Sequence, residues 1–288
     1  NHPTYGVAKA FVGDNGSIIG DVRDIHYIPA RRAFRLFSSP INSKTNIYDN
    51  WQASGLSIAN TGTHITGNGT NGTDKTATGN PSLFTFNNSS QSWSAVTSTN
   101  GTNDKIFAGV PYRIMVRGDR KIDLTDANPT ATFTYLYNIG SLNTKDTTIS
   151  MGSSTSSNTD VFMGNPFFGP LDMGELLGSS TTNTNMKSNI MYIWDPTINT
   201  RGGYVSVSLP SGSNSAGSQA DQYLMPGQAA FIKTNNAGSA SLTFDNAAIT
   251  NTTRNATFRT ERDFQELRIQ LFQTDSLLNN GPVADGVL

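Results

Sequence analysis

Short runs of alternating or continuous apolar residues, separated by Gly, Asn, Asp and Pro, recur along the chain. A period of two residues is typical of a β-strand with one buried face, and turn-forming residues mark the limits of each run. The pattern predicts strands at 17–28, 32–37, 110–117, 131–137, 189–194, 203–209, 228–234, 240–244 and 264–273. This number of strands predicts an all-β protein, built as an antiparallel β-sandwich or barrel.

Helical periodicity is scarce. Asp outnumbers Glu 18 to 3, and Asp favours turns and caps whereas Glu favours helix interiors. The one predicted helix is 170–178, where Pro170 opens a turn and Gly178 ends it. Such a short helix is expected to cover the end of a sheet.

The order of the elements occurs twice, which predicts two related halves. Each half contains four elements in the same order: a strand with a proline turn, an aromatic hairpin, a strand led by Gly and Pro, and a strand rich in Thr or Ser. In the first half they lie at 34–40, 83–96, 108–118 and 131–142, and in the second half at 160–170, 192–207, 224–234 and 238–249. Chance similarity among hairpins is the alternative. We therefore expect a segment or linker at 1–14, a first half at 15–150, a second at 151–260, and at 261–288 a strand that leads into a following module.

Long loops rich in Gly, Ser, Thr and Asn separate the predicted strands. They cover 60–80, 97–104, 141–159 and 210–221. Because side chains of these types cannot drive burial, we expect these loops to be exposed.

The composition points to the outside of the cell. Only 14% of the residues are charged, Cys is absent, and Asn, Thr, Ser and Gly make up roughly two-fifths of the chain, far above ordinary usage. The formal net charge is -1 without blocks of one sign, which argues against a nucleic acid or an anionic membrane as partner. No apolar run is long enough for a transmembrane segment.

Several long segments, taken together, resemble a known class of proteins. They are HYIPARRAFRLFSSPIN (26–42), GTHITG (62–67), GNPSLFTFNN (79–88), VPYRIMVRGDRKIDL (110–124), GNPFFGPLDM (164–173), YIWDPTINTRGGYV (192–205), YLMPGQAAFI (223–232), and ELRIQLF followed by NGPVADGVL within 266–288. In this order they are similar to the C-terminal regions of large secreted surface proteins of Bacteroidota, the cargo of the type IX secretion system.

This resemblance implies adhesin-like β-sandwich modules and supplies no catalytic residue. It implies as partners other modules or copies of the same surface protein, and the machinery of secretion and outer-membrane attachment. We therefore expect a non-enzymatic segment at the cell surface with a structural, adhesive or filament-assembly role. No cofactor is expected.

Residues that could perform chemistry are few and scattered. His2, His26 and His64 are the only histidines, no Cys accompanies them, and no G-x-S-x-G turn is present, which argues against zinc chemistry and a hydrolase triad. Each candidate for a glycosidase carboxylate has a local explanation as a cap or turn residue, and the candidates are Asp160, Asp172, Glu175 and Asp195.

Two oxygen-rich segments are candidate calcium sites: Asp14 and Asn15 with Asp21 and Asp24, and Asp119 with Asp123, Asp126 and Asn128. Neither has the spacing of a calcium loop, so ordinary turns are the preferred interpretation and no metal site is predicted.

Aromatic residues supply the alternative function, a carbohydrate-binding module. Trp51, Trp93, Trp194 and Tyr204 are its candidate ligand-binding residues, because sugar rings stack on aromatic faces, and Tyr112, Tyr192 and Tyr223 extend the set. Core packing is the competing interpretation of the same residues. Two or more rings exposed in one plane would favour sugar binding.

Surface glycosylation is a further expectation, because Asp146-Thr147-Thr148 and Asp275-Ser276-Leu277 match the O-glycosylation pattern of that phylum. The candidate acceptors are Thr147 and Ser276.

Overall fold

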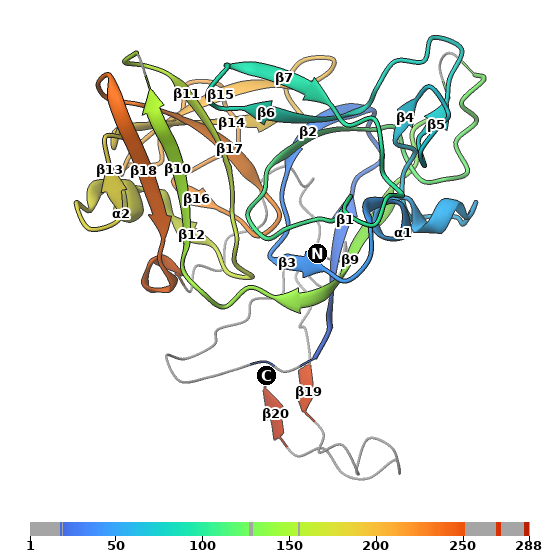
Figure 1. Cartoon of the computed structure of the whole chain (residues 1–288), viewed down its shortest axis with the longest axis horizontal. Coiled ribbons are helices and arrows are strands. Elements are labelled where there is room, and N and C mark those ends of the chain that lie inside the picture. The colour runs from blue at the N-terminus through green and yellow to red at the C-terminus, as the bar shows by residue number, and fades with distance from the viewer. Residues whose placement is uncertain are drawn as a thin grey trace.

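The computed structural model describes residues 18, 20–126, 129–154, 156–250, 269–271 and 285–287. These residues form antiparallel sheets with two short α-helices, which confirms the all-β, sandwich-like fold (Figure 1). The predicted segment 1–14 lies outside the described residues. Of 261–288, the structure describes only an antiparallel pair, β19 (Ile269–Leu271) and β20 (Asp285–Val287).

The first half, called repeat 1, contains a three-stranded sheet of order β1-β9-β3 and a four-stranded sheet of order β2-β8-β6-β7. Its strands are β1 (Val22–Ile28), β2 (Ala33–Phe37), β3 (Ile41–Ser43), β6 (Leu83–Asn87), β7 (Ser92–Ala95), β8 (Tyr112–Val116) and β9 (Thr134–Leu142), with the short parallel pair β4 (Thr66–Gly67) and β5 (Asp74–Lys75), the helix α1 (Ile47–Asn50) and the 3₁₀ turn η1 (Ala53–Gly55).

The second half, called repeat 2, has a three-stranded sheet of order β10-β18-β13 and a four-stranded sheet of order β11-β17-β14-β15. Its elements are β10 (Thr147–Ser154), β11 (Asp160–Gly164), β12 (Leu171–Asp172), α2 (Met173–Gly178), β13 (Asn183–Thr184), β14 (Ile190–Asp195), β15 (Gly203–Ser208), β16 (Tyr223–Leu224), β17 (Ala229–Lys233), β18 (Gly238–Phe244) and η2 (Asn246–Ala248).

The two repeats share one pairing pattern. In each, the first long strand pairs with the last one, as β1 with β9 and β10 with β18. The next strand pairs with the last but one, as β2 with β8 and β11 with β17. The last but one, β8 or β17, also pairs with the first strand of a hairpin, β6 or β14. The four pairs of segments matched in the sequence occupy equivalent strands: β2 and β11, the hairpins β6–β7 and β14–β15, β8 and β17, and β9 and β18. The change of repeat falls at 143–146, so the expected boundary at residue 150 lies inside β10.

Each repeat has its own apolar core between its two sheets. In β8, Tyr112, Ile114 and Val116 point into the core of repeat 1, while the alternate residues are half-buried on the other face. In β14, Met191 and Ile193 do the same in repeat 2. The inner four-stranded sheets of the two repeats face each other, and the three-stranded sheets lie on the outside (Figure 1).

For two segments, the prediction of an exposed loop was wrong. Segment 141–159 contains the whole of β10. Its β-branched residues pair with β18, and the hydroxyls of Thr148 and Thr243 bond across the strands at 2.9 Å. Segment 60–80 is not wholly exposed, since Thr63, Ile65 and their neighbours are buried. Hydrogen bonds to main-chain carbonyls, such as that from Thr63 to Gly118, make this burial of hydroxyls tolerable.

The predicted helix 170–178 is present as α2, which begins at Met173. The carboxylate of Asp172 accepts hydrogen bonds from the amides of Gly174 and Glu175, so Asp172 is the N-cap that the sequence indicated. Met173, Leu176 and Leu177 are buried in the core of repeat 2. Pro170 precedes the helix and does not open it.

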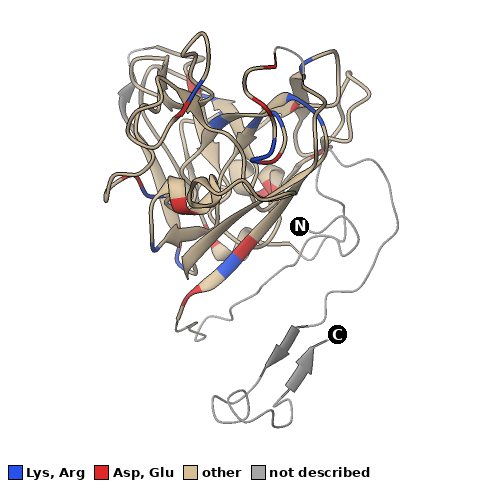
Figure 2. Cartoon of the chain, turned by 90° about the vertical axis from the view of Figure 1, so that its right-hand side faces the viewer, with Lys and Arg blue, Asp and Glu red and all other residues tan. Residues whose placement is uncertain are grey.

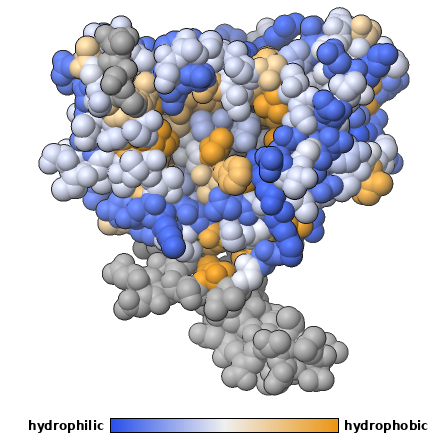
Figure 3. All heavy atoms as spheres, in the orientation of Figure 1, coloured by the Kyte–Doolittle hydropathy of each residue, from blue (hydrophilic) through white to orange (hydrophobic). Residues whose placement is uncertain are grey.

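Charged residues are sparse on the folded chain, and both signs occur side by side (Figure 2). A hollow with apolar atoms at its floor opens between the two repeats on the face shown in Figure 3. Within the described ranges, no helix has the length and apolar character needed to cross a membrane.

Close main-chain contacts join the repeats at equivalent turns. The amide of Ser38, just after β2, donates to the carbonyl of Gly227, and its hydroxyl donates to the carbonyl of Gln228 at 2.8 Å. At Gly164, the last residue of β11, a Cβ would lie 2.4 Å from that of Ser38 and 2.8 Å from the carbonyl oxygen of Gly109. Only glycine allows this approach.

We predict that Gly164→Ala lowers the free energy of unfolding by about 1–3 kcal/mol, because the new methyl group meets main chain that cannot move away. Denaturant unfolding of the whole chain measures this effect. Gly178→Ala is the matched control, since nothing lies within 4 Å of its added Cβ, and its stability should not fall. Equal stability of Gly164→Ala and the wild type would contradict the tight contact between repeats.

Candidate functional site

The facing four-stranded sheets enclose a third apolar cluster, which we call the junction. Its buried members come from both repeats: Leu36 from β2, Phe162 from β11, and Ala229 and Phe231 from β17. The half-buried rings packed against them are Phe86, Trp93, Tyr192 and Trp194. The junction exists because β2, β11 and β17 carry buried apolar residues on both faces, so each repeat covers the second face of the other.

The rings of the junction pack mainly edge to face. Phe162 and Phe231 are the exception, because they stack with centroids 4.6 Å apart and planes 16° apart. Phe86 and Trp93 approach Phe231 at 5.2 and 5.9 Å with steep angles, and the ring of Trp194 meets that of Tyr204 at 87°. These geometries suit the ring quadrupoles and stabilise the contact beyond the burial of area.

Arg113 of β8 inserts its guanidinium among these rings. The guanidinium carbon lies 3.9 Å from the ring centroid of Phe34, 5.4 Å from that of Trp93 and 6.0 Å from that of Trp194. Burial lowers the pKa of Arg113, and the nearby hydroxyl of Tyr204 acts in the opposite direction. Arg113 therefore remains a partly desolvated cation that contacts aromatic rings of both repeats.

The tip of the β6–β7 hairpin closes the free edge of β11. The side-chain amide of Asn88 accepts from the amide of Phe162 at 2.8 Å and donates to its carbonyl at 3.3 Å. The side chain of Gln91 pairs in the same way with the amide and carbonyl of Asp160, at 3.0 and 2.8 Å. Two neutral side chains thus replace a neighbouring strand and satisfy an edge that would otherwise attract other chains.

The structure brings together three of the four aromatic candidates. Trp93, Trp194 and Tyr204 meet at the junction, whereas Trp51 is 1% exposed in the core of repeat 1, against Phe37 and Tyr112. The steep ring angles mean that the three do not form a flat platform. Tyr204 alone among them is largely accessible, with 49% of its surface exposed.

Sequence reasoning missed Arg113 and Phe231 as members of this site. A usable signal was present, because the matched order of segments aligns Leu36 with Phe162, and their strand partners are Arg113 and Phe231. The two residues therefore occupy equivalent positions in the two repeats. Comparing the outward-facing positions of the matched strands would have identified both.

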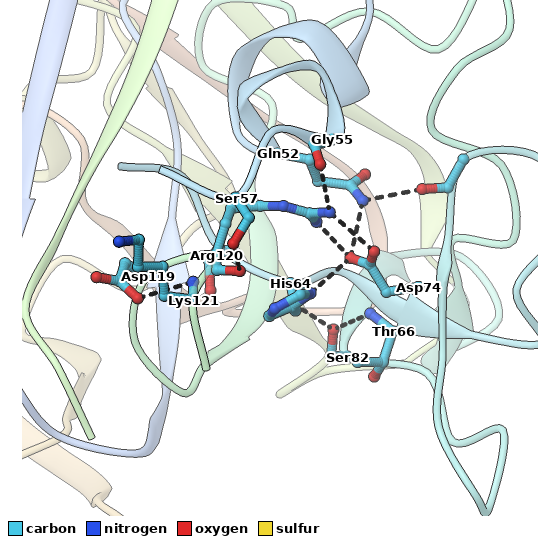
Figure 4. A network of polar contacts seen from close by, with 12 residues as sticks. Gln52, Gly55, Ser57, His64, Thr66, Asp74, Ser82, Asp119, Arg120 and Lys121 are labelled. Carbon is cyan, nitrogen blue, oxygen red and sulfur yellow. Dashed lines mark hydrogen bonds and ion pairs between the residues drawn. The ribbon is translucent and has the colours of Figure 1, made fainter. Parts of the chain in front are cut away.

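A second polar cluster lies inside repeat 1 and surrounds Asp74 (Figure 4). Arg120 donates to both carboxylate oxygens of Asp74, at 2.5 and 3.0 Å, and Nδ1 of His64 lies 3.1 Å from Oδ2 of Asp74. The amide of Gln52 adds a bond of 3.2 Å, and Arg120 also donates to the carbonyl of Gly55. These contacts attach the 60–80 segment to Gln52, which links α1 to η1, and to the turn that follows β8.

The charge state of this cluster follows from its contacts. Burial by itself raises the pKa of Asp74, but the hydrogen bonds from His64 and Arg120 and their positive charge outweigh it, so the pKa lies below its ordinary value. The hydroxyl of Ser82 donates to the main-chain carbonyl of His64 at 3.5 Å. It does not contact the imidazole ring, so the arrangement is not a nucleophile–base pair.

The other acidic and histidine candidates each have a local partner. His26 and Asp24 are both buried, with Nε2 and Oδ2 2.6 Å apart, and Gly227 of repeat 2 packs on the His26 ring. Asp160 pairs with Lys233 at 2.5 Å, and Asp195 accepts two bonds of 2.7 Å from Thr197 as a turn residue. Glu175 is exposed on α2, and His2 lies outside the described residues.

In the two candidate calcium segments, the acidic side chains that the structure describes do not converge on one point. Asp21 pairs with Lys44 and Asp24 with His26, Asp119 accepts from the amides of Asn60 and Lys121, and Asp123 binds Thr125. Asp14, Asn15 and Asn128 are not described. Among the residues with described positions, no group of three or more His, Cys, Asp or Glu could hold a metal ion.

Of the two candidate O-glycosylation residues, Thr147 begins β10 and is half-buried. Its hydroxyl accepts a hydrogen bond of 3.1 Å from the side-chain amide of Asn143 and donates one of 3.2 Å to the carbonyl of Lys145. Both partners belong to the link between the repeats. Ser276 lies outside the described residues. Glycosylation of either residue stays a prediction.

Comparisons of the chain with family models, with curated proteins and with solved structures gave no significant match. The functional argument therefore rests on the residues and their geometry.

We predict that Asp74→Asn lowers the free energy of unfolding at pH 7 by about 3 kcal/mol, because it leaves the buried guanidinium of Arg120 without its counter-charge. The folded pKa of Asp74 is depressed, so its contribution is present above its ordinary pKa of 3.8 and is lost as the pH falls through the folded value. Urea unfolding measures the free energy of unfolding of the variant and of the wild type at pH 7 and pH 3. The difference between these two free energies should be smaller at pH 3 than at pH 7.

The exposed pair Lys44 and Asp21 provides the matched control. Asp21→Asn should leave stability unchanged at pH 7, because exposed ion pairs contribute little. If Asp74→Asn lowers the free energy of unfolding no more than Asp21→Asn does, the cluster has no stabilising role and the prediction is contradicted.

Proposed function

We propose that this chain is a non-enzymatic segment of a large exported surface protein, in which it serves as a rigid structural and adhesive unit. The observation that carries the proposal is the junction, which fuses two repeats of the same topology through one continuous aromatic core. A spacer or filament subunit must transmit load between its neighbours without bending, and a packed interface between repeats meets that requirement.

The chemistry of the contacts supports a place outside the cell. The repeats are joined by glycine turns, rings and neutral amides, with few ion pairs, so their association depends little on salt. Together with the sequence resemblance, this supports export by type IX secretion and attachment at the outer membrane, with other modules or copies of the surface protein as partners.

Carbohydrate binding is the second candidate function. The edge-to-face packing of Trp93 and Trp194 supports a packing role for these two rings. One observation nevertheless favours a ligand, namely that the exposed ring of Tyr204 and the guanidinium of Arg113 both border the ring of Trp194, at 5.0 and 6.0 Å from its centroid. A glycan contacted there would give the adhesive unit its target.

We predict that the chain unfolds in one step when it is pulled from its two ends in a single-molecule force experiment. The junction couples the two repeats, so neither should open before the other. The double variant Phe86→Ser and Trp93→Ser removes two rings from the cluster, and it should separate the event into two steps at lower force.

The control for this experiment is Leu56→Ser, because Leu56 is 57% exposed and lies outside the junction. It should unfold as the wild type does. Two independent steps in the wild-type chain would contradict a rigid fused unit and with it the proposed structural role.

A further inference from the structure

Arg113 occupies a position where the fold itself does not require a cation. Its equivalent in repeat 2 is Phe231, which is 6% exposed and stacked on Phe162. The same strand in the same topology thus accepts an apolar ring at this position. An arginine in repeat 1 therefore needs another explanation than the architecture of the sheet.

The guanidinium of Arg113 has ring contacts but no anion. It stacks on Phe34 and approaches Phe84, Trp93 and Trp194, and it makes no hydrogen bond or ion pair with any residue that the structure describes. Removing a cation partly from water is costly unless it is paired. Its rigid fork of N–H donors is therefore left available for a carboxylate.

The neighbouring groups favour a sugar acid over a simple anion. Tyr204 of β15, in the other repeat, presents a half-exposed ring. Its centroid lies 5.0 Å from that of Trp194, and the guanidinium carbon of Arg113 lies 6.0 Å from the same Trp194 ring, so both groups border one indole. A uronic acid unit carries a carboxylate and an apolar face of C–H groups on one rigid ring. The carboxylate can accept two bonds from the guanidinium while the C–H face rests on the tyrosine ring.

We propose that Arg113 and Tyr204 form a binding site for the carboxylated sugar units of an acidic polysaccharide, built across the two repeats. This inference rests on the proposed adhesive function and names its target. Because its two groups come from different repeats, the site is complete only while the junction holds them side by side.

The test is affinity electrophoresis of the whole chain in gels that contain alginate, a polymer of uronic acids, compared with gels that contain neutral dextran. Alginate should retard the wild-type chain and dextran should not, and added salt should weaken the retardation. Arg113→Met, which keeps the apolar stem, should weaken alginate binding about tenfold or more, because a charge-assisted bidentate contact is lost. Tyr204→Ala should weaken it through loss of the ring.

Arg23→Met is the matched control. Arg23 also stacks on a ring, with its guanidinium carbon 4.5 Å from the centroid of Tyr137, but it lies on β1, away from the junction. This variant should bind alginate as the wild type does. Arg113→Met should fold, since the equivalent position already holds a phenylalanine, and Tyr204→Ala changes an exposed side chain and provides an independent test.

Three results would overturn the site: no retardation by alginate, equal retardation of Arg113→Met and wild type, or tighter binding of poly-glutamate than of alginate. The last result would assign the site to acidic peptides. None of these results affects the single-step unfolding under force, so failure of this inference is distinguishable from failure of the proposed structural role.

Discussion

Aromatic packing between the two inner sheets is the interaction on which the rest of this structure depends. A two-layer sandwich normally buries one face of each sheet and leaves the other to water. Here the second faces of the inner sheets carry rings such as Phe86, Phe162 and Phe231, which would form a large exposed apolar patch on a separate repeat. The repeats cover these faces for each other and so become one body.

Several local features follow from that contact. Gly109, Gly164 and Gly227 stand where main chain of one repeat touches the other, and Gly109 and Gly227 precede equivalent strands with positive φ angles of 75° and 80°. The hairpin β6–β7 extends over β11 and pairs with its edge through Asn88 and Gln91. The abundance of Asn, Ser and Thr thus has a structural use, since neutral side chains satisfy buried main-chain groups without the cost of burying charges.

Much of the fold could be predicted from period-two patterning, because most strands have one face in a repeat core. The helix cap at Asp172 and the repeated order of segments could also be predicted from the sequence. Strand β10 was missed because its Thr and Ser residues lack apolar alternation, and its partner β18 is 95 residues away at the bond between Thr148 and Thr243. Burial of His64 was missed because its partner Asp74 is held by Arg120, which lies 46 residues further along the chain.

The candidate site was predictable only in part. Trp93, Trp194 and Tyr204 were recognised as aromatic candidates, but the same criterion selected Trp51, which lies in a core. Residue type alone does not say which face of a strand points inward, and that depends on register. Arg113 was overlooked because a single arginine in an apolar strand carries no motif, and its meaning appears only beside Phe231 in the second repeat.

Native-state hydrogen exchange of the backbone amides tests the fusion of the repeats most directly. The amides of β9 and β18, the central strands of the two outer sheets, report on repeat 1 and repeat 2 separately. If the junction makes them one unit, both sets exchange with the same free energy of opening, equal to that of global unfolding. A distinctly smaller value for either strand would mean that one repeat opens alone, which would contradict the account.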